Sequence, residues 1–265
     1  MKTTRWIAGV LAAGLMAALA GAAEEASRNV VGFVRVDLAP GFNLVAYNWD
    51  AGTEDGRVSV QELFATERMT GGRTAGAADN ILFWDAQAQR YVTVWLYDSG
   101  GRFPAYDGQW IKADGSGLAE QTVGRGDAFW VVNRSDQTVT QYMKGEAVQE
   151  DEIERTIPEG YSMFGRAYTT PRAVNEMEWS GAQGGRTAGT ADNILFWDAE
   201  AQRYVTIWLY DSGGRFPAYD GQWIKADGSG PAENAFAAGV GAWYVRRGSG
   251  ALVWSDKRLH PSGIE

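Results

Sequence analysis

Two stretches of the sequence place large aromatic side chains in glycine-rich, loop-like surroundings, where such side chains are less expected than in strands. An exposed ring beside Asp or Gln can stack on a sugar, while its polar neighbours bind the hydroxyl groups. The competing interpretation is that these rings cover the end of a hydrophobic core. The candidate ligand-binding residues are Tyr106, Asp107 and Trp110 in the first stretch and Tyr219, Asp220 and Trp223 in the second, with Phe103 and Phe216 nearby.

The same stretches contain acidic residues next to glycine and serine, which could supply oxygen ligands to calcium. The candidate metal ligands are Asp98 and Asp114, with Asp211 and Asp227 as their counterparts. The EF-hand spacing is absent, however, and Asp-Gly pairs are common in simple turns. Calcium is therefore the one cofactor that the sequence leaves open.

Residues for nucleophilic catalysis are scarce. The chain has no cysteine, and its single histidine is His260, near the C-terminal end. A Ser-His-Asp triad, a thiolate site and a His-rich metal site are therefore excluded. A glycosidase-like pair of carboxylates stays open, because Asp and Glu are plentiful, but nothing places two of them opposite each other. We predict that the protein is not an enzyme.

The tripeptide Arg125-Gly126-Asp127 resembles the integrin-type motif. It occurs once, and the corresponding stretch of the second half of the chain reads Val240-Gly241-Ala242. Because motifs this short often arise by chance, we interpret the tripeptide as a chance match.

Residues 1–23 have the pattern of a secretory signal peptide. Lys2 and Arg5 precede an uncharged apolar stretch, small residues follow, and the charge changes at Glu24. After a tail over 24–29, the mature chain is expected to be extracytoplasmic, either secreted or associated with the cell surface, and not inserted in a membrane. The formal net charge of −9 argues against nucleic acid as a partner, because phosphates need a basic surface.

The strongest pattern in the sequence is an internal duplication. At a constant offset of 113 residues, segments 71–117 and 184–230 differ at only three positions. Either recent copying or a task shared by both copies explains this near-identity. The three differences are Ala77 against Thr190, Gln87 against Glu200, and Val94 against Ile207.

The similarity continues more weakly on both sides of this duplicated block, so the repeated unit is longer than the block. Upstream, 40–44 resembles 159–163, and downstream Ala128-Phe129-Trp130 resembles Ala242-Trp243-Tyr244. We therefore predict one module over 30–149 and a second over 150–257, followed by a tail over 258–265.

Short alternating apolar runs between glycine-rich turns predict strands throughout each module. The run 91–97 is apolar on both faces and is expected to be covered on both sides. Each module has room for one short helix at most. In module 1 it is expected at 60–66 with Ser59 as its cap, and in module 2 at 173–179, preceded by Pro171, which suits the first helical position. The predicted fold class is all-β, with two tandem homologous modules that are each a sandwich or a small barrel. The predicted strands are 30–38, 42–49, 81–84, 91–97, 110–112, 129–133 and 138–143, with 194–197 and 204–210 repeating the third and fourth.

Several of these pieces also form a recognisable series along the chain. They are Gly41-Phe42-Asn43-Leu44, Phe83-Trp84-Asp85, Tyr97-Asp98, Gly124 to Val131, Gly145-Glu146 and Ile157-Pro158-Glu159-Gly160. The series resembles the tandem repeats of a group of secreted bacterial proteins of unknown role. The resemblance covers nearly the whole chain after the leader and implies an extracytoplasmic repeat module. It implies no activity, ligand or catalytic residue.

Composition and motifs together favour a non-catalytic module protein of the cell surface or extracellular matrix, which acts by binding or by self-association. The first alternative is a bivalent carbohydrate-binding protein, in which two sites would add avidity for a glycan. A calcium-dependent adhesin and a polysaccharide hydrolase are the third and fourth possibilities. If there is a ligand, we expect two equivalent sites, one in each module.

Overall fold

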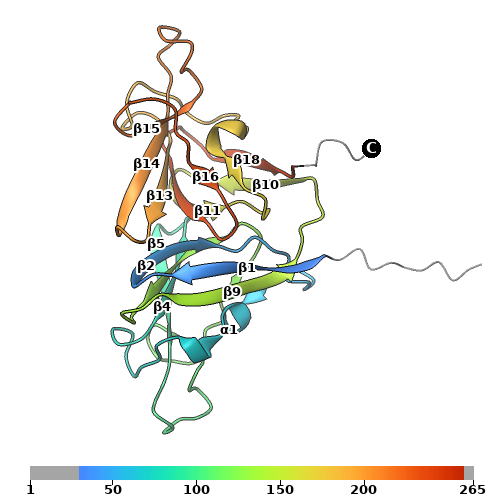
Figure 1. Cartoon of the computed structure of the whole chain (residues 1–265), viewed down its shortest axis with the longest axis vertical. Coiled ribbons are helices and arrows are strands. Elements are labelled where there is room, and N and C mark those ends of the chain that lie inside the picture. The colour runs from blue at the N-terminus through green and yellow to red at the C-terminus, as the bar shows by residue number, and fades with distance from the viewer. Residues whose placement is uncertain (1–29, 260–265) are drawn as a thin grey trace, which may run out of the picture.

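The computed structural model describes residues 30–259 (Figure 1). The predicted signal peptide 1–23, the tail 24–29, His260 and the end of the tail 258–265 lie outside the described residues. Among the described residues, no helix is long and apolar enough to cross a membrane. The chain is nearly all β, as predicted, and its strands pair in two sets.

The first set of strands forms module 1. Its five-stranded antiparallel sheet has the order β2-β8-β4-β5-β6 and is accompanied by the two-stranded ribbons β1-β9 and β3-β7. The elements are β1 (Val31–Leu38), β2 (Gly41–Ala46), β3 (Val58–Ser59), α1 (Val60–Leu63), the 3₁₀ helix η1 (Thr66–Arg68), β4 (Asn80–Asp85), β5 (Arg90–Leu96), β6 (Trp110–Lys112), β7 (Thr122–Val123), β8 (Ala128–Asn133) and β9 (Val139–Glu146).

The second set forms module 2 and repeats this topology strand for strand. Its sheet has the order β11-β17-β13-β14-β15, with the ribbons β10-β18 and β12-β16. In the described part of the chain, each named strand pairs only with strands of its own module. The elements are β10 (Glu152–Ile157), β11 (Gly160–Gly165), β12 (Arg172–Ala173), the 3₁₀ helix η2 (Val174–Glu176), β13 (Asn193–Asp198), β14 (Arg203–Leu209), β15 (Trp223–Lys225), β16 (Ala235–Phe236), β17 (Gly241–Arg246) and β18 (Leu252–Lys257).

The predicted helices are shorter than expected. In module 1 the Ser59 hydroxyl accepts a hydrogen bond from the Gln61 backbone N–H at 3.3 Å, which caps α1, but this helix is a single turn. In module 2 the predicted segment 173–179 contains only η2, and Pro171 precedes β12 rather than starting a helix. Helices of a single turn depend on tertiary packing for their stability.

Trp110 and Trp223 belong to the cores of the two modules. Trp110, the first residue of β6, is 0% exposed and packs in one cluster with Ile81 and Phe129. Trp223 is also 0% exposed and lies in the equivalent cluster of module 2. The structure corrects the prediction that these two tryptophans bind a ligand, because a side chain without exposed surface cannot stack on one. They cover the core instead.

Strand β5 explains why the run 91–97 is apolar on both faces. Val94 and Leu96 point into the core of module 1. On the other face, Trp95 lies in a separate small cluster with Ala78 and Ile111. This second face is only partly covered, contrary to the prediction, and it borders the cleft described below.

The two modules meet through aromatic side chains of their five-stranded sheets. Trp84 packs edge-on against Trp243 with ring centroids 5.0 Å apart, and Trp130 packs against Trp197 at the same 5.0 Å. Trp84 and Trp197 are equivalent in the repeat. Trp130 and Trp243 are equivalent as well, because each stands opposite the fourth residue of the neighbouring strand. The predicted alignment of Phe129 with Trp243 is therefore wrong by one residue, and the junction is close to two-fold symmetric.

Polar contacts at the junction also occur in pairs. The Trp84 indole N–H donates to the Tyr161 carbonyl oxygen at 2.7 Å, and the Gln89 side-chain amide donates to the same oxygen at 3.0 Å. The equivalent bonds of the other half join Trp197 and Gln202 to the Phe42 carbonyl oxygen at 2.7 and 3.0 Å. All four donor residues lie in the duplicated block, so the near-identity of its two copies preserves contacts between the modules.

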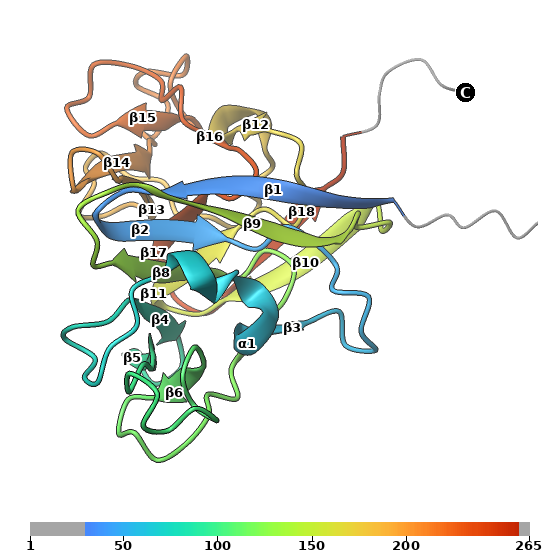
Figure 2. The same cartoon turned by 60° about the horizontal axis from the view of Figure 1, so that its bottom comes forward.

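Backbone hydrogen bonds cross the junction at two equivalent places. The Ala46 N–H donates to the Gly239 carbonyl oxygen at 3.0 Å, and the Gly165 N–H donates to the Gly126 carbonyl oxygen at 2.9 Å. The two modules extend from this junction in different directions. The β5–β6 loop of module 1 and the β14–β15 loop of module 2 lie at opposite ends of the molecule (Figures 1 and 2).

Candidate functional site

A cleft of about 590 Å³ lies among the loops at the end of module 1. This volume is within the range of ordinary small-molecule sites. The lining side chains come from four separate parts of the sequence that the sheet brings together. They are Arg73, Thr74 and Ala75 before β4, Trp95 and Tyr97 at the end of β5, Phe103 and Tyr106 in the β5–β6 loop, and Ile111 with the turn 113–117 around β6.

Aromatic rings form much of this cleft. Trp95 is 5% exposed, and its ring centroid lies 5.6 Å from that of Tyr97. Phe103 and Tyr106 are 48% and 44% exposed, although rings of this size are usually buried. The cleft thus combines a fixed inner ring with outer rings that solvent and a ligand can reach.

The loop that carries Phe103 and Tyr106 is held in place by Asp107. Its carboxylate accepts hydrogen bonds from the Ser99 N–H at 2.6 Å, the Ser99 hydroxyl at 2.9 Å and the Gly101 N–H at 2.9 Å. The Ser99 hydroxyl oxygen in turn accepts from the Phe103 N–H at 2.7 Å. A loop fixed in this way loses little conformational entropy when a ligand binds.

The hydrogen bonds from Ser99 lower the pKa of Asp107 below its ordinary value. Since this pKa is lower in the folded than in the unfolded chain, the stabilisation is present above the ordinary value and is lost as the pH falls through the lowered one. The loop therefore keeps its anchor at neutral and mildly acidic pH.

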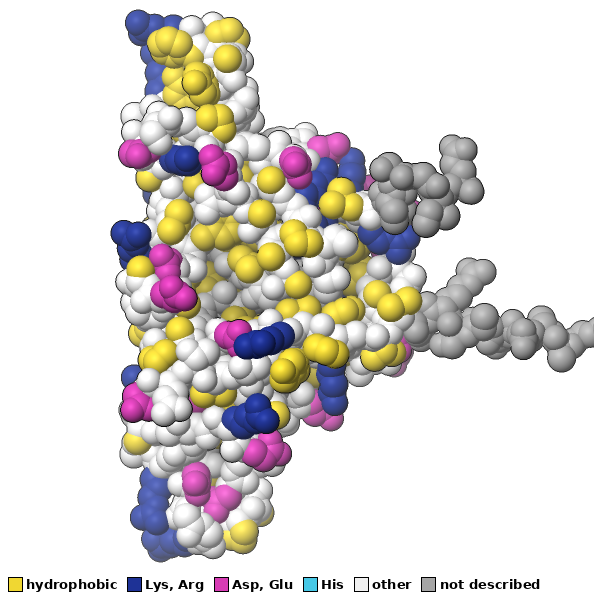
Figure 3. Space-filling model, viewed as in Figure 1, with side chains coloured by type: hydrophobic (Ala, Val, Ile, Leu, Met, Phe, Trp, Pro, Cys, Tyr) yellow, Lys and Arg dark blue, Asp and Glu magenta, His cyan; other side chains and the backbone are white. Residues whose placement is uncertain are grey.

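Two arginines lie beside the rings. The Arg73 guanidinium donates to the Ser99 carbonyl oxygen from Nε at 3.2 Å and from Nη2 at 2.7 Å, which fixes its position in the lining. The Arg102 guanidinium lies 5.3 Å from the centroid of Phe103, within cation–π distance. Basic side chains are visible at both ends of the molecule in Figure 3.

Module 2 reproduces this arrangement, because every lining residue of the cleft belongs to the duplicated block and none is among the three differences. Phe216 and Tyr219 are 49% and 44% exposed, and Trp208 is 6% exposed. The Asp220 carboxylate accepts from the Ser212 N–H at 2.6 Å, as Asp107 does from Ser99. The two modules therefore present the same aromatic surface.

The structure separates the predicted ligand-binding residues by role. Tyr106 and Tyr219 reach the clefts, and Asp107 and Asp220 anchor the loops that present them. The prediction missed the lining residues Arg73, Trp95 and Tyr97. Their membership of the duplicated block was the only sequence signal for them.

The four predicted metal ligands do not come together. The Asp98 carboxylate accepts from the Gly100 N–H at 2.7 Å, and the Asp114 carboxylate accepts from the Ser116 N–H at 2.9 Å, so each belongs to its own turn. Asp211 and Asp227 make the same two bonds in module 2. Within residues 30–259, no three His, Cys, Asp or Glu side chains are grouped so as to hold a metal ion.

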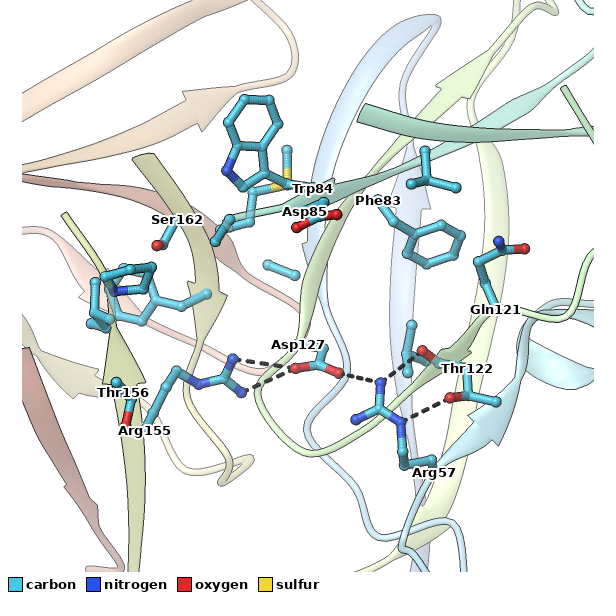
Figure 4. Close-up of a pocket in the computed structure, with 18 residues that line it drawn as sticks. Arg57, Phe83, Trp84, Asp85, Gln121, Thr122, Asp127, Arg155, Thr156 and Ser162 are labelled. Carbon is cyan, nitrogen blue, oxygen red and sulfur yellow. Dashed lines mark hydrogen bonds and ion pairs between the residues drawn. The ribbon is translucent and has the colours of Figure 1, made fainter. Parts of the chain in front are cut away.

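A second cavity, of about 330 Å³, lies at the junction of the modules (Figure 4). Asp127 lies in its wall between two arginines. Its carboxylate accepts from Arg57 at 2.9 Å and from Arg155 of module 2 at 3.2 Å. By the register of β8 and β17, the residue equivalent to Asp127 is Val240, so this polar arrangement occurs only on one side of the junction.

The tripeptide 125–127 is accounted for by the same contacts. Arg125 forms an ion pair with Glu150 and lies 3.6 Å from the Asp50 carboxylate. Asp127 joins the two modules. Both charged side chains are thus bound within the protein, in agreement with a chance match to the integrin-type motif.

The two end clefts are the best candidates for a functional site, since the same residues build the same geometry twice. Each offers aromatic rings, a fixed guanidinium and one carboxylate, Asp114 or Asp227. These groups suit a ligand with apolar faces and several hydroxyl groups. No protein-family model, curated protein or solved structure matches the chain.

Proposed function

We propose that the protein is an extracytoplasmic, non-catalytic carbohydrate-binding protein with one binding cleft in each module. The observation that carries this proposal is the aromatic cleft, which is built twice from identical residues. The extracytoplasmic location is supported by the signal-like pattern of residues 1–23.

The chemistry of the cleft supports a sugar ligand. The C–H face of a pyranose ring can stack on Phe103 and Tyr106, which already expose nearly half of their surface. Around these rings, the tyrosine hydroxyl, the Arg73 guanidinium and the Asp114 carboxylate offer donors and acceptors to the sugar hydroxyls. A small number of polar groups around an apolar surface is the usual composition of a ligand pocket.

The same inventory supports binding without hydrolysis. Most glycosidases act through two carboxyl groups on either side of the bond that is cleaved. Asp114 is the single carboxylate in the lining of the module 1 cleft. The nearby Asp107 carboxylate is occupied by hydrogen bonds from Ser99 and Gly101.

The test is retention on a glycan array and on insoluble cellulose, chitin, xylan and starch. The informative variant changes the four outer rings to alanine: Phe103, Tyr106, Phe216 and Tyr219. We expect the wild-type chain to be retained by at least one glycan class and the variant to lose at least ~10-fold in affinity, equivalent to about 1.4 kcal/mol.

A matched control is the variant Phe33→Ala/Tyr142→Ala, which removes two exposed aromatic rings outside the clefts. This control should bind as the wild type does. Equal retention of the four-ring variant, or no retention of the wild type on any glycan, would show that the proposed function is wrong.

A further inference from the structure

The symmetry of the junction fixes the relative placement of the two clefts. A two-fold axis turns one module onto the other, so the two copies of a surface far from the axis lie far apart in the molecule. The paired tryptophans Trp84 and Trp197 lie close to this axis. The loops that build the clefts lie at opposite ends of the molecule in both views (Figures 1 and 2).

The junction also resists a change in this arrangement. Its rings and hydrogen bonds hold the sheets together across two symmetric halves. The segment that links the modules is fixed as well, since Val148 is 5% exposed and the Tyr168 hydroxyl donates to the Glu150 carbonyl oxygen at 2.9 Å. A change in the relative position of the two modules would therefore break buried contacts.

Two linked sites increase affinity for one target only when both can reach it at the same time. Clefts at opposite ends of a rigid molecule cannot both bind one short oligosaccharide. They can, however, each hold a different chain. The two sites are therefore suited to bridging two glycan chains.

Resting on the proposed carbohydrate binding, we infer that the protein cross-links separate polysaccharide molecules. One chain is bound at the end formed by Phe103 and Tyr106, and another at the end formed by Phe216 and Tyr219. The protein then acts as a rigid spacer in a glycan network.

The test uses soluble polymers of the glycan class that retains the protein: hydroxyethyl cellulose, glycol chitin, soluble xylan or soluble starch. Polymer and full chain are mixed over a range of ratios and followed by light scattering. We expect large complexes near equivalence, smaller ones with either component in excess, and dispersal by an excess of the matching short oligosaccharide.

The duplication provides matched single-cleft variants. Phe103→Ala/Tyr106→Ala and Phe216→Ala/Tyr219→Ala each keep one intact cleft. Both should still bind the polymer and both should lose the large complexes, with one site per chain where the wild type has two.

The possible failures are distinct. If the wild type fills two sites per chain but leaves the polymers dispersed, the cross-linking inference is wrong while the proposed function stands. If single-cleft variants cross-link as well as the wild type, the network arises in another way and the inference is again wrong. If the wild type binds no polymer, both the inference and the proposed function are wrong.

Discussion

Trp130 and Trp243 should contribute equally to stability if the junction is two-fold symmetric. Trp130 is 3% exposed and contacts the rings of Phe42, Trp197 and Tyr204. Trp243 is 5% exposed and makes the same three kinds of contact in the other half. Their replacement by alanine opens equivalent cavities on the two sides of the junction.

Loss of a buried tryptophan costs about 3–5 kcal/mol, through lost burial and the cavity that is left. We expect Trp130→Ala and Trp243→Ala each to lower the free energy of unfolding by this amount, and the two losses to agree within about 1 kcal/mol. The control Phe33→Ala removes an exposed ring and should change stability by no more than about 0.5 kcal/mol.

The assay is equilibrium unfolding in urea, followed by far-ultraviolet circular dichroism so that the loss of a fluorescent tryptophan does not disturb the signal. The midpoint and the slope of each transition are compared with those of the wild type. A two-fold symmetric junction would be excluded if one variant were as stable as the wild type while the other lost several kcal/mol, because the two tryptophans make equivalent contacts in such a junction.

Three further predictions concern buried side chains and the four candidate metal ligands. Trp110→Ala and Trp223→Ala should each lower the free energy of unfolding by about 3–5 kcal/mol, since both side chains are fully buried; a stable variant with selectively lost binding would contradict this. Arg166→Met leaves the carboxylate of Asp256 buried without its 2.9 Å partner and should cost about 3–5 kcal/mol, measured by thermal and urea unfolding, whereas an unchanged midpoint would show that the pair is dispensable. Millimolar calcium should leave the melting temperature unchanged, because the four candidate aspartates each belong to a separate turn; a rise that chelator reverses would reveal a site that the structure does not show.

Local patterns in the sequence predicted the longer strands of module 1, together with β13 and β14 of module 2. The turn between β4 and β5 and the start of β6 at Trp110 follow from alternation and turn residues, which act over a few neighbouring positions. The short helices were predicted less well, because a single helical turn depends on packing more than on its own residues.

The composition of the clefts was only partly predictable. Tyr106 and Trp110 are four residues apart in similar surroundings, yet one is exposed and the other is buried. The difference arises because β6 begins at Trp110 and its pairing with Leu96 turns the indole into the core. Arg73 and Trp95 join the same cleft only through the sheet, which a pattern along the chain cannot show.

The junction was also beyond local patterns. Trp84 belongs to a predicted strand, but its partner Trp243 lies in the other module. The near-identity of the duplicated block was the available signal, since one block supplies both an end cleft and half of a self-complementary contact. Shared packing at the junction therefore constrains the block.

The number of binding sites per chain is the decisive measurement for carbohydrate binding by two identical clefts. Isothermal titration of the full chain with the oligosaccharide identified on the array should give two equivalent sites for the wild type. It should give one site, with unchanged affinity, for Phe103→Ala/Tyr106→Ala and for Phe216→Ala/Tyr219→Ala. One site in the wild type, or two sites in either variant, would contradict the account of two identical clefts at the ends of the molecule.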